Sequence, residues 1–171
     1  PSVRVAPHRQ QPLEDGIAYA KQECGFPYVF LTTNGSLATP NRLRRCFEAG
    51  LDSLKFSFNY ADVAQFEDIA RVKPKLFHKM VRNIHEARAV RDAVFEQTGR
   101  KCGLYASYIE YDGEQGRRML ETLDEIRDCV DEIYALPLYN QANLVTEDEK
   151  KQGWKPIAGN RGRVGALRDP L

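Results

Sequence analysis

The stretch Tyr28–Gly35, which has the sequence YVFLTTNG, decides how this chain folds. Its first four residues are apolar, and such a short apolar run predicts a buried β-strand. Two threonines, an asparagine and a glycine then end the run abruptly. Barrels and open α/β sheets carry their chemistry at the carboxyl ends of their strands. We therefore expect a buried strand over residues 28–31, followed by a turn that carries functional groups.

Three later segments resemble this one. Leu54, Phe56 and Phe58 alternate with polar residues and predict a second strand over 53–58. Residues 102–109 and 133–138 are expected to form the third and fourth strands. Each strand ends in hydroxyl or amide side chains, and these are Ser57 and Asn59, Ser107 and Tyr108, and Tyr139 and Asn140.

Helical patterns separate these strands. We expect helices over 13–24, 39–50, 62–73, 75–97 and 113–129, from apolar spacings of three and four together with caps. Leu13, Ile17, Ala20 and Cys24 form the apolar stripe of the first helix. Thr39, Pro40 and Asp62 are good start signals, and Gly50 and Gly99 are natural stops. Strands joined by helices run parallel through right-handed crossovers, so the chain is α/β, as an arc of a barrel or as a doubly wound sheet.

Composition excludes several classes of protein. The 25 basic and 24 acidic residues leave a net charge of +1, which gives no support for nucleic-acid or membrane binding. No apolar run approaches the roughly 20 residues that span a bilayer. The four cysteines form no C-x-x-C pair, so we expect buried, reduced thiols and a cytoplasmic protein. His78 and His85 lie seven residues apart, which is not the four-residue spacing of a metal pair.

We expect two regions along the chain. Residues 1–143 would form the α/β unit, beginning with a loop over 1–11, and residues 144–171 an extended tail or linker toward a missing C-terminal domain. The first residue is Pro1 and not Met, which suggests a fragment of a longer protein.

The polar strand ends should meet at one rim of a parallel sheet. Their hydroxyls and amides suit hydrogen bonds to a ribose, a base edge or a peptide group. No histidine or pair of carboxylates joins them, so they form no nucleophile–base set. The alternative is that these residues only lead into loops.

Two of these segments resemble a known family. Residues 31–37, LTTNGSL, are similar to the third-strand signature of radical S-adenosylmethionine (SAM) enzymes, and 51–58, LDSLKFSF, resemble the fourth strand. Residues 66–69, 79–91 and 106–109 resemble the branch that carries a C-terminal SPASM extension. The resemblance covers about residues 13–140.

This resemblance implies a partial (β/α)6 TIM-like barrel with about four βα units present. In the family, SAM lies across the rim, near Thr32 and Ser57, with Asn34 and Ser107 as further candidates. The full-length protein would be an oxidoreductase that cleaves SAM reductively with a [4Fe–4S] cluster to a 5′-deoxyadenosyl radical. The expected substrate is a peptide or protein. No catalytic residue and no metal ligand is assigned in this chain.

The chain departs from the family at three places. The C-x-x-x-C-x-x-C cluster loop, the Gly-Gly-Glu loop and the cysteine-rich SPASM segment are absent. The cluster ligands would therefore lie outside this chain, which alone is expected to be inactive, or the chain is a degenerate homologue. One alternative is a non-catalytic α/β module that binds a nucleotide-like ligand or a protein partner. Another is a barrel aldolase or isomerase that uses Lys55, the only lysine within a predicted strand.

Overall fold

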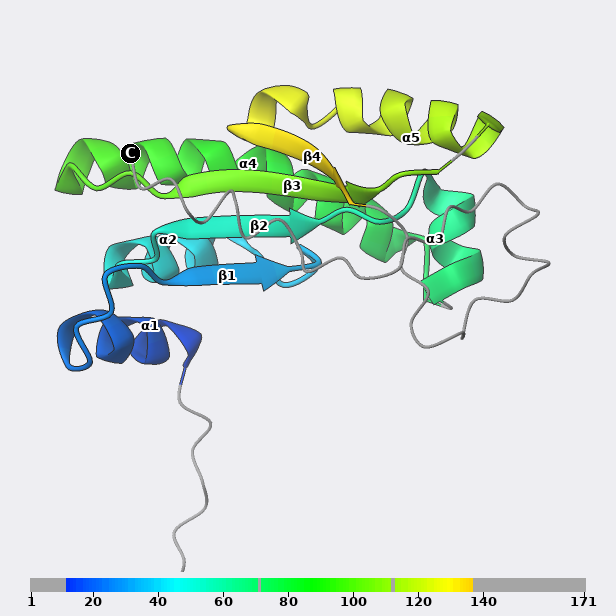
Figure 1. Ribbon diagram of the computed structural model, residues 1–171. Coiled ribbons are helices and arrows are strands. Elements are labelled where there is room, and N and C mark those ends of the chain that lie inside the picture. The colour runs from blue at the N-terminus through cyan, green and yellow to red at the C-terminus, as the bar shows by residue number, and fades with distance from the viewer. Residues whose placement is uncertain (1–11, 71, 112, 137–171) are drawn as a thin grey trace, which may run out of the picture.

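A computed structural model describes residues 12–70, 72–111 and 113–136 (Figure 1). In chain order its elements are α1 (Leu13–Gln22), β1 (Phe30–Thr33), α2 (Pro40–Ala49), β2 (Ser53–Ser57), α3 (Val63–Ala70), α4 (Lys75–Thr98), β3 (Gly103–Ile109), α5 (Gly113–Asp124), the 3-10 helix η1 (Arg127–Cys129) and β4 (Glu132–Leu136).

The four strands form one parallel sheet in the order β1-β2-β3-β4. The strand order follows the chain without the reversal that defines a doubly wound sheet. Successive crossovers of one hand then place their helices on the same face, and Figure 1 shows α2, α4 and α5 behind and above the strands. The predicted α/β fold is confirmed, and its form is an arc of a barrel.

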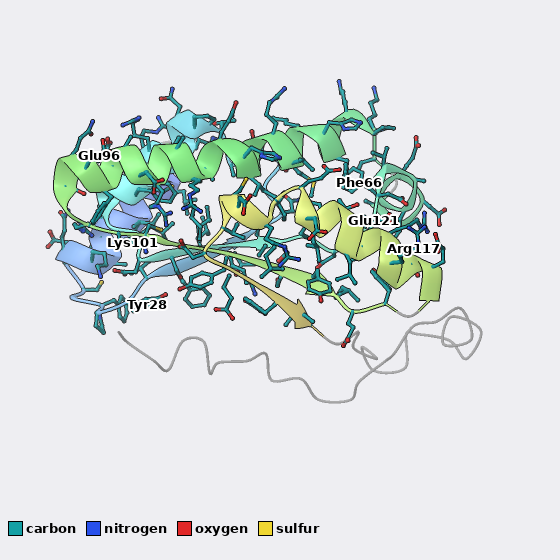
Figure 2. All side chains as sticks on the ribbon, turned by 90° about the horizontal axis from the view of Figure 1, so that it is seen from above. Tyr28, Phe66, Glu96, Lys101, Arg117 and Glu121 are labelled. Carbon is teal, nitrogen blue, oxygen red and sulfur yellow. The ribbon has the colours of Figure 1, made fainter. Side chains whose placement is uncertain are left out.

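The two faces of the sheet differ in what covers them. On the helix-covered face, Leu54, Phe56, Leu104 and Ala106 are at most 1% exposed and form the centre of the core. Successive side chains of a strand point to opposite faces, so the residues between them share the other side. We call this side the open face, since Figure 2 shows α4 and α5 along the opposite side of the sheet. Its members are Phe30 and Thr32 of β1, Ser53, Lys55 and Ser57 of β2, Gly103, Tyr105, Ser107 and Ile109 of β3, and Glu132, Tyr134 and Leu136 of β4.

Several helix ends follow the sequence signals. Gly50 has φ +108°, and the Leu51 N–H bonds to the Cys46 carbonyl at 3.1 Å, as in a Schellman cap. The Asp62 carboxylate accepts the Gln65 N–H at 2.8 Å and caps α3. Thr39 occupies the N-cap position of α2, but its side chain makes no capping hydrogen bond.

The first predicted strand was placed too early and was wrongly expected to be buried. β1 begins at Phe30 and includes both threonines. It pairs only with β2 among the described strands, so it is an edge strand, and Phe30 is 53% exposed. The residues before it are held by Asp52, whose carboxylate accepts the Val29 N–H at 2.6 Å.

Three helices are shorter than predicted, and one of them is α3, which covers Val63–Ala70 and not 62–73. α1 ends at Gln22, and Leu13 and Cys24 are exposed because α1 packs on α2 through Ile17. The helix expected to reach Cys129 ends at Asp124 and gives way to η1.

Other predictions of the sequence have mixed outcomes. Cys46 and Cys102 are buried free thiols as predicted, whereas Cys24 is exposed and Cys129 partly exposed. None of the helices in the described ranges is long and apolar enough to cross a membrane. The predicted loop over 1–11, the strand-end residues Tyr139 and Asn140, and the tail over 144–171 lie outside the described residues.

Candidate functional site

The open face carries its polar side chains in rows, because the strands pair in register. Ser57 pairs with Ser107, and Ser107 pairs with Tyr134, so these three form a row near the carboxyl ends of β2, β3 and β4. We call it the rim row. One step toward the amino ends lies a second row, formed by Thr32, Lys55, Tyr105 and Glu132. We call it the inner row.

Ser107 is the most unusual member of the rim row. Its side chain is fully buried, and its Oγ has no hydrogen-bond partner. Leaving a buried hydroxyl unpaired costs about 1–3 kcal/mol. Such groups in folded proteins call for an explanation, and local strain, a functional role, or a bound water molecule or ion are the usual ones.

The four predicted site residues do not all come together. Ser57 and Ser107 are neighbours in register, and Thr32 lies on the same face in the inner row. Asn34 is engaged elsewhere, because its Oδ1 accepts the N–H of Ser36 at 3.1 Å and the Ser36 Oγ–H at 2.8 Å. These bonds make an Asx turn after β1, so Asn34 shapes the rim through the backbone.

The turn after β1 is fixed from the helix side by Asn83 of α4. Asn83 is 2% exposed, and its Nδ2 donates to the Gly35 carbonyl at 2.7 Å. Gly35 has φ +81°, a left-handed conformation that suits glycine. Asn83 was not predicted as a functional residue, because in the sequence it is only an amide within the apolar stripe of α4.

A second hydrogen bond fixes the backbone just after the carboxyl end of β2. The Tyr111 hydroxyl donates to the Asn59 carbonyl at 3.0 Å, and the Asn59 Oδ1 is buried without a hydrogen-bond partner. Burial raises the pKa of Tyr111. Asn59 therefore adds a second unpaired buried acceptor at this end of the sheet.

Two tyrosines of the open face were also missed. Burial is the main cause that raises the pKa of both Tyr105 and Tyr134. The neighbouring Tyr28 raises the pKa of Tyr105 further, and Glu132 raises that of Tyr134 further. The Tyr105 ring leans over Gly103, where an added Cβ would come within 2.6 Å of Cε2. Both phenols stay neutral at pH 7, so Lys55 and Glu132 are the charged side chains of the open face in the described strands. The alternation of side chains along each strand was the sequence signal that could have placed Tyr105 and Tyr134 on this face.

The described cysteines do not suit an iron–sulfur cluster. Cluster ligands must be thiolates gathered around one point. Burial raises the pKa of Cys102 to about 12 and also raises that of Cys46, while Cys24 is exposed and Cys129 lies beside His85, with Sγ 3.2 Å from Nδ1. Within the described ranges no three His, Cys, Asp or Glu side chains are grouped as a metal site.

Two hollows lie away from the rim row. One, of about 470 Å³, lies between α1, α2 and β1, and Leu31, Leu43 and Leu54 are among its apolar lining. The other, of about 490 Å³, lies on the outer side between α4 and α5 and includes His78 and His85. Thr32 is the open-face residue that borders the first, so neither hollow contains Ser57 or Ser107.

Comparisons with known proteins yield only distant structural similarity. No family model matches the chain, and no curated protein matches it. A crystal structure of 2,3-dimethylmalate lyase, a PEP mutase/isocitrate lyase superfamily member, aligns with a TM-score of 0.47 and 11% identity, over 90% of this chain and 59% of that one. A rubisco-like protein from Burkholderia fungorum aligns with a TM-score of 0.40 and 12% identity, over 84% of this chain and 33% of that one. The chain thus spans about three fifths of the length of the first structure and one third of the length of the second.

Proposed function

We propose that this chain is part of the core of a radical SAM enzyme and that its open face positions SAM. The observation that carries the proposal is the pair Ser57 and Ser107. They are adjacent in register at the carboxyl end of the sheet, and Ser107 has a buried Oγ without a partner. The sequence resemblance points to SAM as the ligand, and the rim row offers groups that suit its ribose hydroxyls.

In this proposal the chain binds and orients the cofactor. Ser57 and Ser107 would hydrogen-bond the nucleoside, and Thr32 would lie on the same face beside the methionyl part. Asn83 and the Asx turn of Asn34 would keep the β1 turn in place. SAM, when bound and reduced, supplies radical chemistry, and the electron source would be an iron–sulfur cluster held outside the described residues. The substrate would be a peptide or protein.

Calorimetric titration with SAM tests the binding role. Ser57→Ala and Ser107→Ala should each weaken binding about fivefold to tenfold, the loss expected for one hydrogen bond. Ser53→Ala is the matched control, because Ser53 lies on the same face of β2 at its amino end. Equal losses in all three variants, or no SAM binding by the parent chain, would contradict the proposal.

A longer form of the chain with its native flanks tests the catalytic role. After reconstitution with iron and sulfide, and under reducing conditions, it should bind a cluster and release 5′-deoxyadenosine. A longer protein that binds SAM but neither holds a cluster nor releases this product would instead support a non-catalytic module. One observation favours this second function. The open-face residues of the described strands include no histidine, no cysteine and no nucleophile–base pair.

A further inference from the structure

We infer that the inner row contains an anion subsite centred on Lys55, which binds a carboxylate of the substrate. Lys55 lies on the open face of β2, one residue pair away from the rim row. Its neighbours in register are Thr32 on one side and Tyr105 on the other. The inference concerns the substrate of the proposed reaction and in that respect rests on the proposed function, but its test does not require SAM.

Lys55 has no counter-charge among the residues that the structure describes. Among the described residues it takes part in no hydrogen bond or ion pair, although it is only partly exposed. The other charged side chain of the open face, Glu132, is two strands away in the same row. Strands lie about 4.8 Å apart, so the backbones of Lys55 and Glu132 are separated by about 10 Å. A partly buried, unpaired ammonium is most stable when an anion joins it.

The surrounding groups favour a carboxylate over a phosphate. A phosphate site normally gathers several donors, such as free backbone N–H groups at a helix start or more than one cation. Here the backbone of β2 is paired with strands on both sides, and Lys55 is the only cation in its row. Thr32 can add one hydroxyl donor, while the Tyr105 ring leans away over Gly103. One ammonium and one hydroxyl match the single charge of a carboxylate.

The position of the subsite separates it from the proposed cofactor groups. Ser57 follows Lys55 by two residues, which along a strand is about 6.6 Å. A cofactor whose nucleoside is held at the rim row would therefore leave Lys55 to a second molecule, with Thr32 lying between the two. The partly buried Tyr105 and Tyr134 give this part of the open face apolar surface for the body of that molecule.

Nuclear magnetic resonance titration of the 171-residue chain with hexanoate tests the subsite. Hexanamide and hexylamine serve as neutral and cationic probes of the same length. We expect hexanoate alone to shift the backbone amides around Lys55. Lys55→Met should weaken that binding about tenfold or more, as expected for loss of a charge-assisted bond. Lys55→Arg should retain it, and so should Lys101→Met, since Lys101 is exposed at the opposite, amino end of the sheet (Figure 2).

Three results would overturn the inference. These are hexanoate binding that survives Lys55→Met, equal binding of hexylamine, and loss of binding in Lys55→Arg as well as in Lys55→Met, which would show that the positive charge at position 55 does not itself hold the anion. Thermal unfolding of each variant identifies any that fails to fold. Titration of the same variants with SAM separates the two proposals. Hexanoate binding without SAM binding would support the anion subsite and contradict the cofactor-binding role. SAM binding without hexanoate binding would contradict the anion subsite alone.

Discussion

Two aspartates, Asp52 and Asp131, each stand immediately before a strand and hold the backbone of the neighbouring strand. Asp52 precedes β2 and accepts the Val29 N–H at 2.6 Å and the Lys21 ammonium at 2.9 Å. Asp131 precedes β4 and accepts the Leu104 N–H of β3 at 2.8 Å. These carboxylates fix the amino ends of the strands, opposite the candidate site.

Asp131 also neutralises Arg91, which is 4% exposed, at 3.0 Å. Burial alone would raise the pKa of Asp131, but the Leu104 N–H and Arg91 outweigh it and hold this pKa below its usual 3.8. A carboxyl group with a lowered pKa in the folded state contributes stability that is present above 3.8 and is lost as the pH falls through the folded-state pKa.

Asp131→Asn should therefore lower the free energy of unfolding by about 2 kcal/mol at pH 7, because the Arg91 guanidinium loses its charge-assisted hydrogen bonds to Asp131. The difference from the parent chain should shrink as the pH is lowered below 3.8. Urea unfolding at a series of pH values measures both. Asp92→Asn is the control, since Asp92 also contacts Arg91 but its side chain is 52% exposed, and its cost should stay within about 0.5 kcal/mol. An equal cost for both variants would contradict the assignment to Asp131.

Asn83 is the second residue whose role can be tested alone. Asn83→Ala should cost about 1–3 kcal/mol, because it leaves the Gly35 carbonyl without its buried donor. It should also speed hydrogen exchange in the turn that follows β1. Asn41→Ala is the matched control, since Asn41 is exposed on α2. Faster exchange in this turn in both variants, or in neither, would show that Asn83 does not hold it.

At the scale of elements, β1 is the strand whose environment differs most from that of its neighbours. β2 and β3 are paired on both sides and their helix-side residues are fully buried, whereas β1 pairs with β2 alone among the described strands. Its sequence FLTT contains no charge, and exposed edge strands without charge are prone to pair with other chains. Tyr28 and Leu37, at 46% and 60% exposure, extend the apolar surface on both flanks.

Phe30→Lys should reduce aggregation of the chain on warming at little cost in stability, because Phe30 is 53% exposed and a lysine on an edge strand opposes intermolecular pairing. Light scattering during a temperature ramp measures aggregation, and the unfolding midpoint by circular dichroism measures stability. Phe95→Lys is the control, because Phe95 is a similarly exposed phenylalanine on α4. If both substitutions reduce scattering equally, exposed apolar area and not the free edge is responsible.

For the whole molecule, the arrangement of the strands predicts an order of local stability. Leu54, Phe56, Leu104 and Ala106 place the centre of the core on β2 and β3. Backbone groups that open only when the core opens exchange their hydrogens most slowly.

Hydrogen exchange followed by mass spectrometry should therefore find β2 and β3 the most protected strands, with β1 exchanging at least about tenfold faster. β4 should lie between them, because Asp131 and Arg91 tie its start to β3 and α4. Protection of β1 equal to that of β2 would mean that the free edge is covered in solution, by another part of the chain or by a second copy.

The sequence by itself determined the elements and the class of fold. Alternation in residues 53–58, the spacing of three and four in the helices, and signals such as Gly50 and Asp62 are local, so each could be recognised without knowledge of the rest of the chain. The succession of strands and helices then required parallel pairing. The sequence also marked Ser57 and Ser107 as strand-end residues, and only the register of β2 against β3 makes them neighbours.

Tertiary structure decided the properties that depend on contacts distant in sequence. It directed Asn34 into its own turn and placed Asn83 beneath that turn from 48 residues away. It left the Ser107 hydroxyl buried and unpaired. Within the described ranges it also left Lys55 without a counter-charge on the open face. Whether a side chain is buried or paired depends on which strands and helices pack against it. A local sequence pattern shows whether a segment is a strand or a helix, but it does not show which elements become its neighbours.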